Sequence, residues 1–217
     1  MCIICIMNNR SLTKKEFGAA FDSNHHGFGF AFSDGNNVTY SKGYMKKKEA
    51  WGAYQRVPVP HVAHFRIQSA GGVSPELTHP FKISRESEIK FAYHAPTPVL
   101  FHNGTISDWK TMLMCAIMQI GKTPTQPMSD SRAMAIMISL SGEDALDLFS
   151  GSNKFTIVST DGIKKFGTWI EDDGNFFSNR SYQAEKVTFR GAPSQWKLDD
   201  RGFVVKQAQF FNDEYDD

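Results

Sequence analysis

The sequence predicts an α+β protein built from layers of sheet and helix. Short apolar runs typical of strands lie near both ends of the chain, at residues 2–40 and again at 155–170. Segments with apolar residues at helical spacing lie between these strand clusters, and the longest covers residues 106–120. Because helices separate clusters of strands instead of alternating with single strands, a layered α+β domain is favoured over a doubly wound one.

The first half begins with a buried strand over residues 2–7, a short run rich in β-branched residues that polar residues close. A helix follows over 13–22, because Thr13 and Glu16 form a capping-box pattern ahead of an apolar stripe. The further elements expected here are a hairpin of residues 27–32 and 38–40 around the turn 34–37, and a helix over 46–56 that begins with the solvated lysines 46–48.

The second half is predicted to hold three helices among strands. The expected strands cover residues 62–68, 91–93, 98–101, 155–159 and 167–170, and the expected helices cover 106–120, 131–140 and 143–149. The apolar stripe of the helix over 106–120 predicts that it packs on a sheet. Residues 183–217 are expected to add a C-terminal strand and a frayed acidic tail to a single domain of residues 1–217.

The charge balance and the cysteines exclude several classes of protein. The 24 Lys and Arg against 23 Asp and Glu leave no excess charge for nucleic acid or an anionic membrane. The three cysteines are too few for a disulfide framework, which points to a reducing compartment. No apolar run approaches the roughly 20 residues of a membrane span, and no signal peptide is visible, so we expect a cytoplasmic protein.

Cys2 and Cys5 form a C-x-x-C pattern, but on a strand their odd spacing places them on opposite faces. Cys5 is therefore expected to be a small buried hydrophobic residue rather than half of a redox or metal pair. Cys2 differs, because removal of Met1 would leave one residue with both a thiol and a free α-amine. The amine, with a usual pKa of roughly 7.7 to 8.0, can take the thiol proton and return it to a leaving amine.

Three segments, HFRIQSAG (64–71), LFHNGTI (100–106) and SDS (129–131), resemble in order the motifs of the class II glutamine amidotransferase domain. That family begins with a nucleophilic cysteine exposed by removal of Met, and the resemblance covers residues 2–182. It implies the Ntn-hydrolase fold, a four-layer αββα sandwich. It also implies that Cys2 attacks L-glutamine to form a γ-glutamyl thioester, which releases ammonia and then glutamate.

The resemblance implies a role for five further residues. Asn103 and Gly104 would stabilise the oxyanion, and their side-chain amide and backbone N–H are donors suited to that task. Arg66 would bind the α-carboxylate of glutamine with help from Ser69, and Asp130 would bind the α-ammonium. Taken alone, the same residues are compatible with a plain turn at 103–104, a surface ion pair of Arg66, and an N-cap role of Asp130.

The sequence departs from the family motifs at three positions. Ile67 stands where the family often has Trp, Ala70 where a His often stands, and Arg132 where many members have Glu. The His that some members use to couple glutamine cleavage to a synthase domain is therefore absent. The motifs therefore predict glutamine cleavage more directly than they predict transfer of the ammonia to an acceptor.

No metal and no organic cofactor is expected. His61 and His64 are the best candidates among seven histidines, together with His25 and His26, but odd spacing on a strand separates the first two and no H-E-x-x-H motif occurs. His79, in a His-Pro pair that the family shares, is expected to be structural or part of a substrate loop.

The expected partners are L-glutamine and a separate synthase or acceptor-binding protein, because residues 183–217 are too few for an acceptor domain. Two other functions stay open. One is an N-terminal cysteine amidohydrolase of different specificity, which would not use the pairing of Arg66 and Asp130. The other is a non-catalytic module that senses glutamine or binds a partner, and it would retain Met1.

Overall fold

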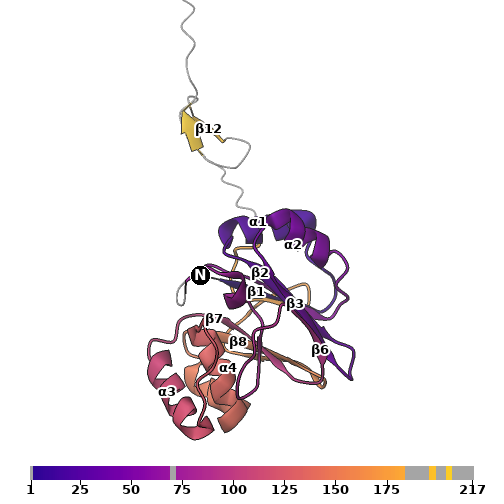
Figure 1. Cartoon of the computed structure of the whole chain (residues 1–217). Helices are drawn as coiled ribbons and strands as arrows, with labels where there is room; N and C mark the ends of the chain where they lie inside the picture. Colours follow the sequence, from indigo (N-terminus) through magenta and orange to yellow (C-terminus); the bar gives the residue numbers. More distant parts are fainter. Residues whose placement is uncertain (1, 69–71, 184–195, 199–203, 207–217) are drawn as a thin grey trace, which may run out of the picture. The chain divides into compact units, whose positions relative to one another are not determined.

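The computed structural model describes residues 2–68, 72–183, 196–198 and 204–206, and the chain divides into two units. The first unit, residues 1–184, stacks two antiparallel sheets with helices on the outer side of each (Figure 1). The second unit, residues 185–217, contains an antiparallel pair of strands, β12 (Trp196–Leu198) and β13 (Val204–Lys206). The acidic tail predicted at its end lies outside the described residues.

The larger sheet of the first unit has the strand order β10-β11-β1-β4-β2-β3-β6, with every pair antiparallel. Its strands are β1 (Ile3–Met7), β2 (Phe28–Ser33), β3 (Val38–Tyr44), β4 (His61–Phe65), β6 (Ala92–Ala95), β10 (Ile170–Asp172) and β11 (Asn175–Phe177). The smaller sheet has the order β5-β7-β8-β9. Its strands are β5 (Phe81–Lys82), β7 (Val99–Asn103), β8 (Lys154–Ser159) and β9 (Gly162–Phe166).

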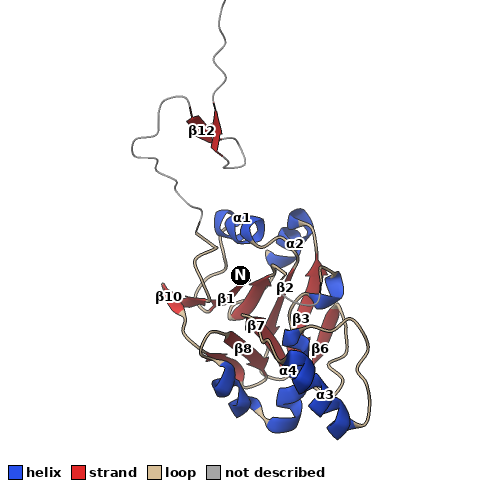
Figure 2. Cartoon of the chain, turned by 90° about the vertical axis from the view of Figure 1, so that its left-hand side faces the viewer, coloured by secondary structure: helices blue, strands red, loops and turns tan. Residues whose placement is uncertain are grey.

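Helices cover the outer face of each sheet, as Figures 1 and 2 show from two sides. The α-helices are α1 (Lys14–Ser23), α2 (Lys47–Tyr54), α3 (Trp109–Ile120) and α4 (Asp130–Ser141), and the 3-10 helices are η1 (Pro75–Leu77) and η2 (Glu143–Phe149). Helices α1 and α2 cover the larger sheet, whereas α4 and η2 cover the smaller one.

Strand β1 shows how the layers are held together. Ile3 and Cys5 point into an apolar cluster beneath α1 and α2, while Ile4 and Ile6 point into a second cluster between the two sheets. A third cluster lies between the smaller sheet and α4. Every residue of β1 is buried, so the predicted strand and the predicted four-layer αββα order are both confirmed. The alternation also confirms that Cys5 faces the helices as a buried hydrophobic residue.

Several predicted boundaries were wrong. Helix α3 begins at Trp109 rather than at residue 106, and it packs on α4 rather than on a sheet, because its buried residue Ala116 lies against Ala133 and Ile136. The return strand after the turn at 160–162 follows at once as β9, and not at 167–170. Strand β4 ends at Phe65, three residues earlier than predicted.

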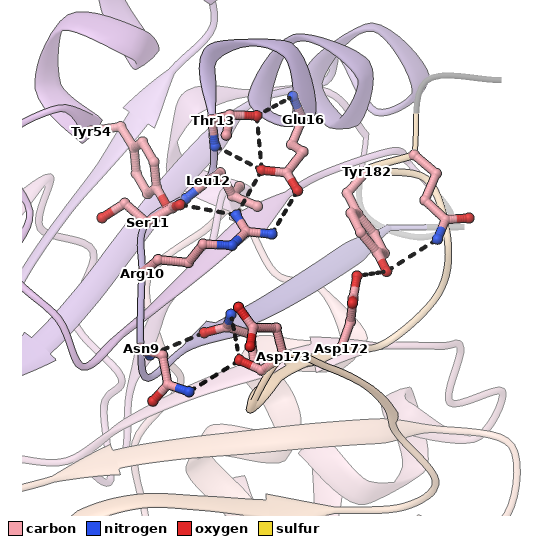
Figure 3. Close-up of polar contacts among 12 residues, drawn as sticks. Asn9, Arg10, Ser11, Leu12, Thr13, Glu16, Tyr54, Asp172, Asp173 and Tyr182 are labelled. Carbon is pink, nitrogen blue, oxygen red and sulfur yellow. Dashed lines mark hydrogen bonds and ion pairs between the residues drawn. The ribbon is translucent and has the colours of Figure 1, made fainter. Parts of the chain in front are cut away.

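The loop after β1 is fastened to the start of α1 and to the β10–β11 turn (Figure 3). The Glu16 carboxylate forms an ion pair with Arg10 at 2.8 Å and accepts a hydrogen bond from the Thr13 amide at 2.8 Å. The second contact belongs to the predicted capping box, which is confirmed. On the other side, the Asn9 side chain donates to the Asp173 carbonyl at 3.1 Å. These contacts fix β1 between elements that are distant in the sequence.

Lys42, on β3, is a buried cation that organises the segment after η1. Its side chain points inward with the apolar residues of the strand, and its Nζ donates to the carbonyls of Glu76, Thr78 and Pro80 at 3.0, 2.7 and 3.1 Å. Burial lowers the pKa of the Lys42 ammonium. The three carbonyls offset the cost of burying this charge by taking the place of water.

We expect Lys42→Met to lower the free energy of unfolding by about 3 kcal/mol, because three carbonyls, two of them in buried contacts, would lose their donor. Urea unfolding of the purified variant measures the change. Lys48→Met is the matched control, since Lys48 is exposed at the start of α2 and its replacement should change stability by less than about 0.5 kcal/mol. Equal stabilities of the two variants would contradict the structural role of Lys42.

His61 lies on the helix side of β4, in a buried hydrogen-bond network. The Leu12 amide donates to the Tyr54 hydroxyl at 2.9 Å, and that hydroxyl lies 2.9 Å from His61 Nε2. The other ring nitrogen, Nδ1, is 2.8 Å from the Pro58 carbonyl and so must carry the proton. Burial lowers the pKa of His61 to about 4.

Acid should therefore destabilise the protein. The unfolded chain gains a proton at His61 below about pH 6.5, whereas the folded chain does so only near pH 4, so stability is lost as the pH falls through this window. The contribution of His61 is about 3 kcal/mol over the whole window. Urea unfolding at pH 7 and pH 4.5 should show a smaller loss for His61→Gln than for wild type, with exposed His25→Gln as control. Equal losses in the wild type and His61→Gln would refute this assignment.

Candidate active site

Cys2 directly precedes β1, and only 9% of the residue is exposed. Its Sγ donates to the Ile67 carbonyl at 3.1 Å and accepts from the Ile67 amide at 3.3 Å. Burial raises the pKa of the thiol, while the Ile67 amide and the charge of Arg66 act in the opposite direction. The thiol is therefore protonated near neutral pH and needs a base as it reacts.

Arg66 and Asp130 lie within electrostatic reach of this thiol, Arg66 just after β4 and Asp130 at the first turn of α4. Both residues are buried, with 4% of each exposed. The Arg66 guanidinium donates to the Gly72 carbonyl at 2.7 Å. The Asp130 carboxylate accepts from the amides of Ile106 and Ser131 at 3.2 and 2.8 Å. A buried cation and a buried anion thus lie within electrostatic reach of one thiol.

Ser129, rather than Asp130, caps α4, since its hydroxyl accepts from the Arg132 amide. The reading of Asp130 as the N-cap was therefore wrong. The carboxylate is held by backbone amides and keeps acceptor capacity for a ligand.

Asn103, the last residue of β7, is joined to β1 through Ser178. Its Nδ2 donates to the Ser178 hydroxyl at 2.8 Å, and the same hydroxyl accepts from the Ile4 amide at 2.8 Å. The Asn103 Oδ1 atom is buried without a hydrogen-bond partner. Turning the amide over would let the Ser178 O–H donate to Oδ1 and would release the N–H groups.

Gly104 adopts a φ of +151° that favours glycine, and a Cβ there would lie 2.0 Å from Asn153 Oδ1. Asn153 in turn contacts His102 Nε2 at 3.0 Å, and His102 Nδ1 contacts the Ser131 hydroxyl at 2.9 Å. Burial lowers the pKa of His102, whereas Asp130 opposes this. The loop at 103–104 is thus held by a buried network and is more than a surface turn.

Sequence reasoning missed several residues that support this site. Asn179 donates to the Cys2 carbonyl at 2.6 Å, next to the Ser178 contact. Arg132, noted only as a departure from the motif, is a buried clamp that donates to the carbonyls of Ser87, Glu86 and Pro127 at 2.8, 3.1 and 2.9 Å, and to that of Thr125. The Asn179 contact joins positions far apart in the chain and has no local signal in the sequence, whereas the charge of Arg132 inside an apolar helix was a signal for the second contact.

Ser69 lies outside the described residues, so its predicted role stays a prediction. His61 and His64 do point to opposite faces of β4, because His61 bonds Tyr54 beneath α2 and His64 Nε2 contacts the His102 carbonyl at 3.1 Å between the sheets. His79 is buried, with its ring centroid 3.9 Å from that of His64. Among the described residues, no three metal-binding side chains gather into a possible site.

None of the helices in the described part of the chain is long and apolar enough to span a bilayer.

No family model and no curated protein sequence matches the chain. Among the solved structures that match its fold are the following two. The structure of the allosteric regulatory enzyme of purine biosynthesis has a TM-score of 0.58, with 16% identity over 82% of this chain and 41% of that chain. Glutamine phosphoribosylpyrophosphate (PRPP) amidotransferase from B. subtilis, complexed with ADP and GMP, has a TM-score of 0.57 with the same identity and coverage.

The chain therefore spans about two fifths of the length of each matched structure. Its four-layer αββα sandwich matches the fold of these two structures over 82% of this chain, which confirms the predicted fold class.

Proposed function

We propose that this chain is a glutaminase domain of the class II glutamine amidotransferases, with Cys2 as its nucleophile. The observation that carries the proposal is that the Cys2 thiol lies within electrostatic reach of both Arg66 and Asp130. In addition, Ser178 links the strand that follows Cys2 to Asn103 through hydrogen bonds. The shared fold with a PRPP amidotransferase supports it. Arg66 would bind the α-carboxylate of L-glutamine and Asp130 the α-ammonium, with Ser69 assisting.

The reaction follows from these roles. The Cys2 sulfur attacks the side-chain carbonyl carbon of glutamine, while its proton passes to the α-amine that removal of Met1 exposes. The carbonyl oxygen becomes an oxyanion that the Asn103 side chain and the Gly104 N–H stabilise. The C–N bond then breaks, the nitrogen takes the proton, and ammonia leaves. Water attacks the resulting γ-glutamyl thioester, which gives glutamate and restores the thiol.

The acceptor of the ammonia is proposed to lie in a separate protein. Neutral ammonia is the nucleophilic form, and it is a minor fraction at neutral pH, so transfer to a docked acceptor is chemically favoured over release. The coverage supports an acceptor outside these residues, because more than half of each matched structure has no counterpart in this chain.

The test is a glutamine hydrolysis assay on protein of known N-terminus. Glutamate and ammonia should form in equal amounts from L-glutamine, with and without a chelator, and intact mass should show that Met1 is removed in the active fraction. D-glutamine is the substrate control, since Arg66 and Asp130 fix the stereocentre. Full activity of protein that uniformly retains Met1 would exclude the mechanism in which the α-amine of Cys2 is the base. Glutamine binding without hydrolysis would favour the sensing module, and hydrolysis of other amides alone would favour a different amidohydrolase.

A further inference from the structure

The segment after β4 is held by a side chain outside the proposed set of catalytic and binding residues. Beyond the last register pair of β2 and β4, Phe28 with Phe65, the backbone pairing continues. The Arg66 amide donates to the Gly27 carbonyl at 2.8 Å, and the His26 amide donates to the Arg66 carbonyl at 2.9 Å. The next donor on this side, the Gln68 amide, has no strand carbonyl opposite and donates instead to His26 Nδ1 at 2.9 Å.

This contact fixes the protonation state of the ring. A backbone amide can only donate, so His26 Nδ1 must accept and the ring proton must lie on Nε2. Burial, His25 and Arg66 all lower the pKa of His26, which favours the same neutral form. A protonated ring would instead direct an N–H at the Gln68 amide, and the hydrogen bond would be replaced by a repulsive contact between two donors.

The Ile67–Gln68 peptide connects His26 to the nucleophile. Ile67 makes both described hydrogen bonds of the Cys2 thiol, at 3.1 and 3.3 Å, and its neighbour Gln68 is the residue that His26 holds. Arg66, the residue before Ile67, donates a hydrogen bond from its guanidinium to the Gly72 carbonyl. The charged and titratable groups that face His26 or the peptide it holds are His25, Arg66 and Cys2, with Asp130 acting on the last two.

We propose that His26 is a positioning residue of this site, whose neutral imidazole holds the Ile67–Gln68 peptide against the Cys2 thiol and releases it when the ring is protonated. This inference rests on the proposed function only for its effect on catalysis. We call the hydrogen bond from the Gln68 amide to His26 the latch, and it is a property of the fold, independent of the function. It adds an acid-sensitive control to a site whose nucleophile already depends on Ile67 for both of its polar contacts.

The experiment uses two substitutions of opposite character. In His26→Asn the side-chain Oδ1 can occupy the place of Nδ1 and accept from Gln68, but it cannot be protonated near neutral pH. His26→Ala removes the acceptor at every pH. His94→Asn is the matched control, because His94 is an exposed histidine of β6 with no described contact to His26 or Gln68.

The first readout is the hydrogen-exchange protection of the Gln68 amide, followed by NMR at pH 7.5 and pH 5. We expect wild type and His94→Asn to lose about tenfold in protection at pH 5, His26→Asn to stay protected at both pH values, and His26→Ala to be unprotected at both. Equal protection in wild type and His26→Ala would overturn the proposal, whatever the activity. The same acid loss in His26→Asn as in wild type would overturn the protonation step.

The second readout is the pH profile of kcat/KM for glutamine. The acid limb should move to lower pH in His26→Asn, whereas His26→Ala should be impaired about tenfold at pH 7.5. If the exchange results hold but no variant, including the wild type, hydrolyses glutamine, the glutaminase function fails and the latch stands. If hydrolysis is normal and the exchange pattern is absent, the function stands and the latch fails.

Discussion

Serine in place of Cys2 is expected to lower glutaminase turnover by roughly 10³-fold or more. A hydroxyl is a far weaker acid than a thiol, and the proposed base, an α-amine with a pKa near 8, is too mild to ionise it. Burial already raises the pKa of the thiol and would disfavour the ionised form of a serine hydroxyl in the same place as well. The measurement is steady-state glutamate production together with acid-quench trapping of labelled glutamine on the protein.

The control for this variant is Cys115→Ser. Cys115 is the exposed free cysteine of α3, so its replacement removes a reactive thiol without touching β1. We expect normal turnover and normal trapping of the label on Cys2. Full activity of Cys2→Ser, or label that is lost with Cys115, would exclude Cys2 as the nucleophile.

Binding and chemistry should separate in a second set of variants. Losing a charged contact in a desolvated site costs about 2 to 5 kcal/mol, so Arg66→Ala and Asp130→Ala should raise the KM for glutamine by roughly 30-fold or more. Asn103→Ala should instead lower kcat by roughly 100-fold or more, because it removes a donor to the oxyanion. The split between KM and kcat in steady-state kinetics measures both effects.

Two comparisons sharpen this result. Asn36→Ala, exposed in the β2–β3 turn, is the control for a loss of an asparagine. Ser178→Ala tests the amide orientation, since it removes the hydroxyl that holds Asn103, and it should share the kcat defect in part. Unchanged glutamine affinity in Arg66→Ala would reject the substrate site carried over from the family motifs.

Local rules predicted much of the fold. The capping box of α1, the β2–β3 hairpin and the burial of β1 depend on residues close in the chain, and they appear where the pattern places them. The position of α3 does not follow from its own apolar stripe. Helix α4 is more completely buried and already covers the smaller sheet, so α3 packs on α4 instead.

The supporting shell of the site was less predictable, because distant parts of the chain supply it. Asn179 and Ser178 contact Cys2 and Ile4 across more than 170 residues, and no spacing rule connects those positions. Lys42 could have been noticed, since a lysine in phase with Val38 and Tyr40 on a strand implies a buried charge with partners. Its partners, the carbonyls of residues 76, 78 and 80, carry no side-chain signature.

The pairing of β1 with β11 sets an order of events during synthesis. Strand β1 is central in its sheet, yet one of its two neighbours, β11, is made about 170 residues later. Until then the Cys2 carbonyl lacks the Asn179 side chain and the Ile4 amide lacks the Ser178 hydroxyl. Residues 175–179 supply both contacts, and a chain truncated before them would leave the edge of β1 beside Cys2 unpaired.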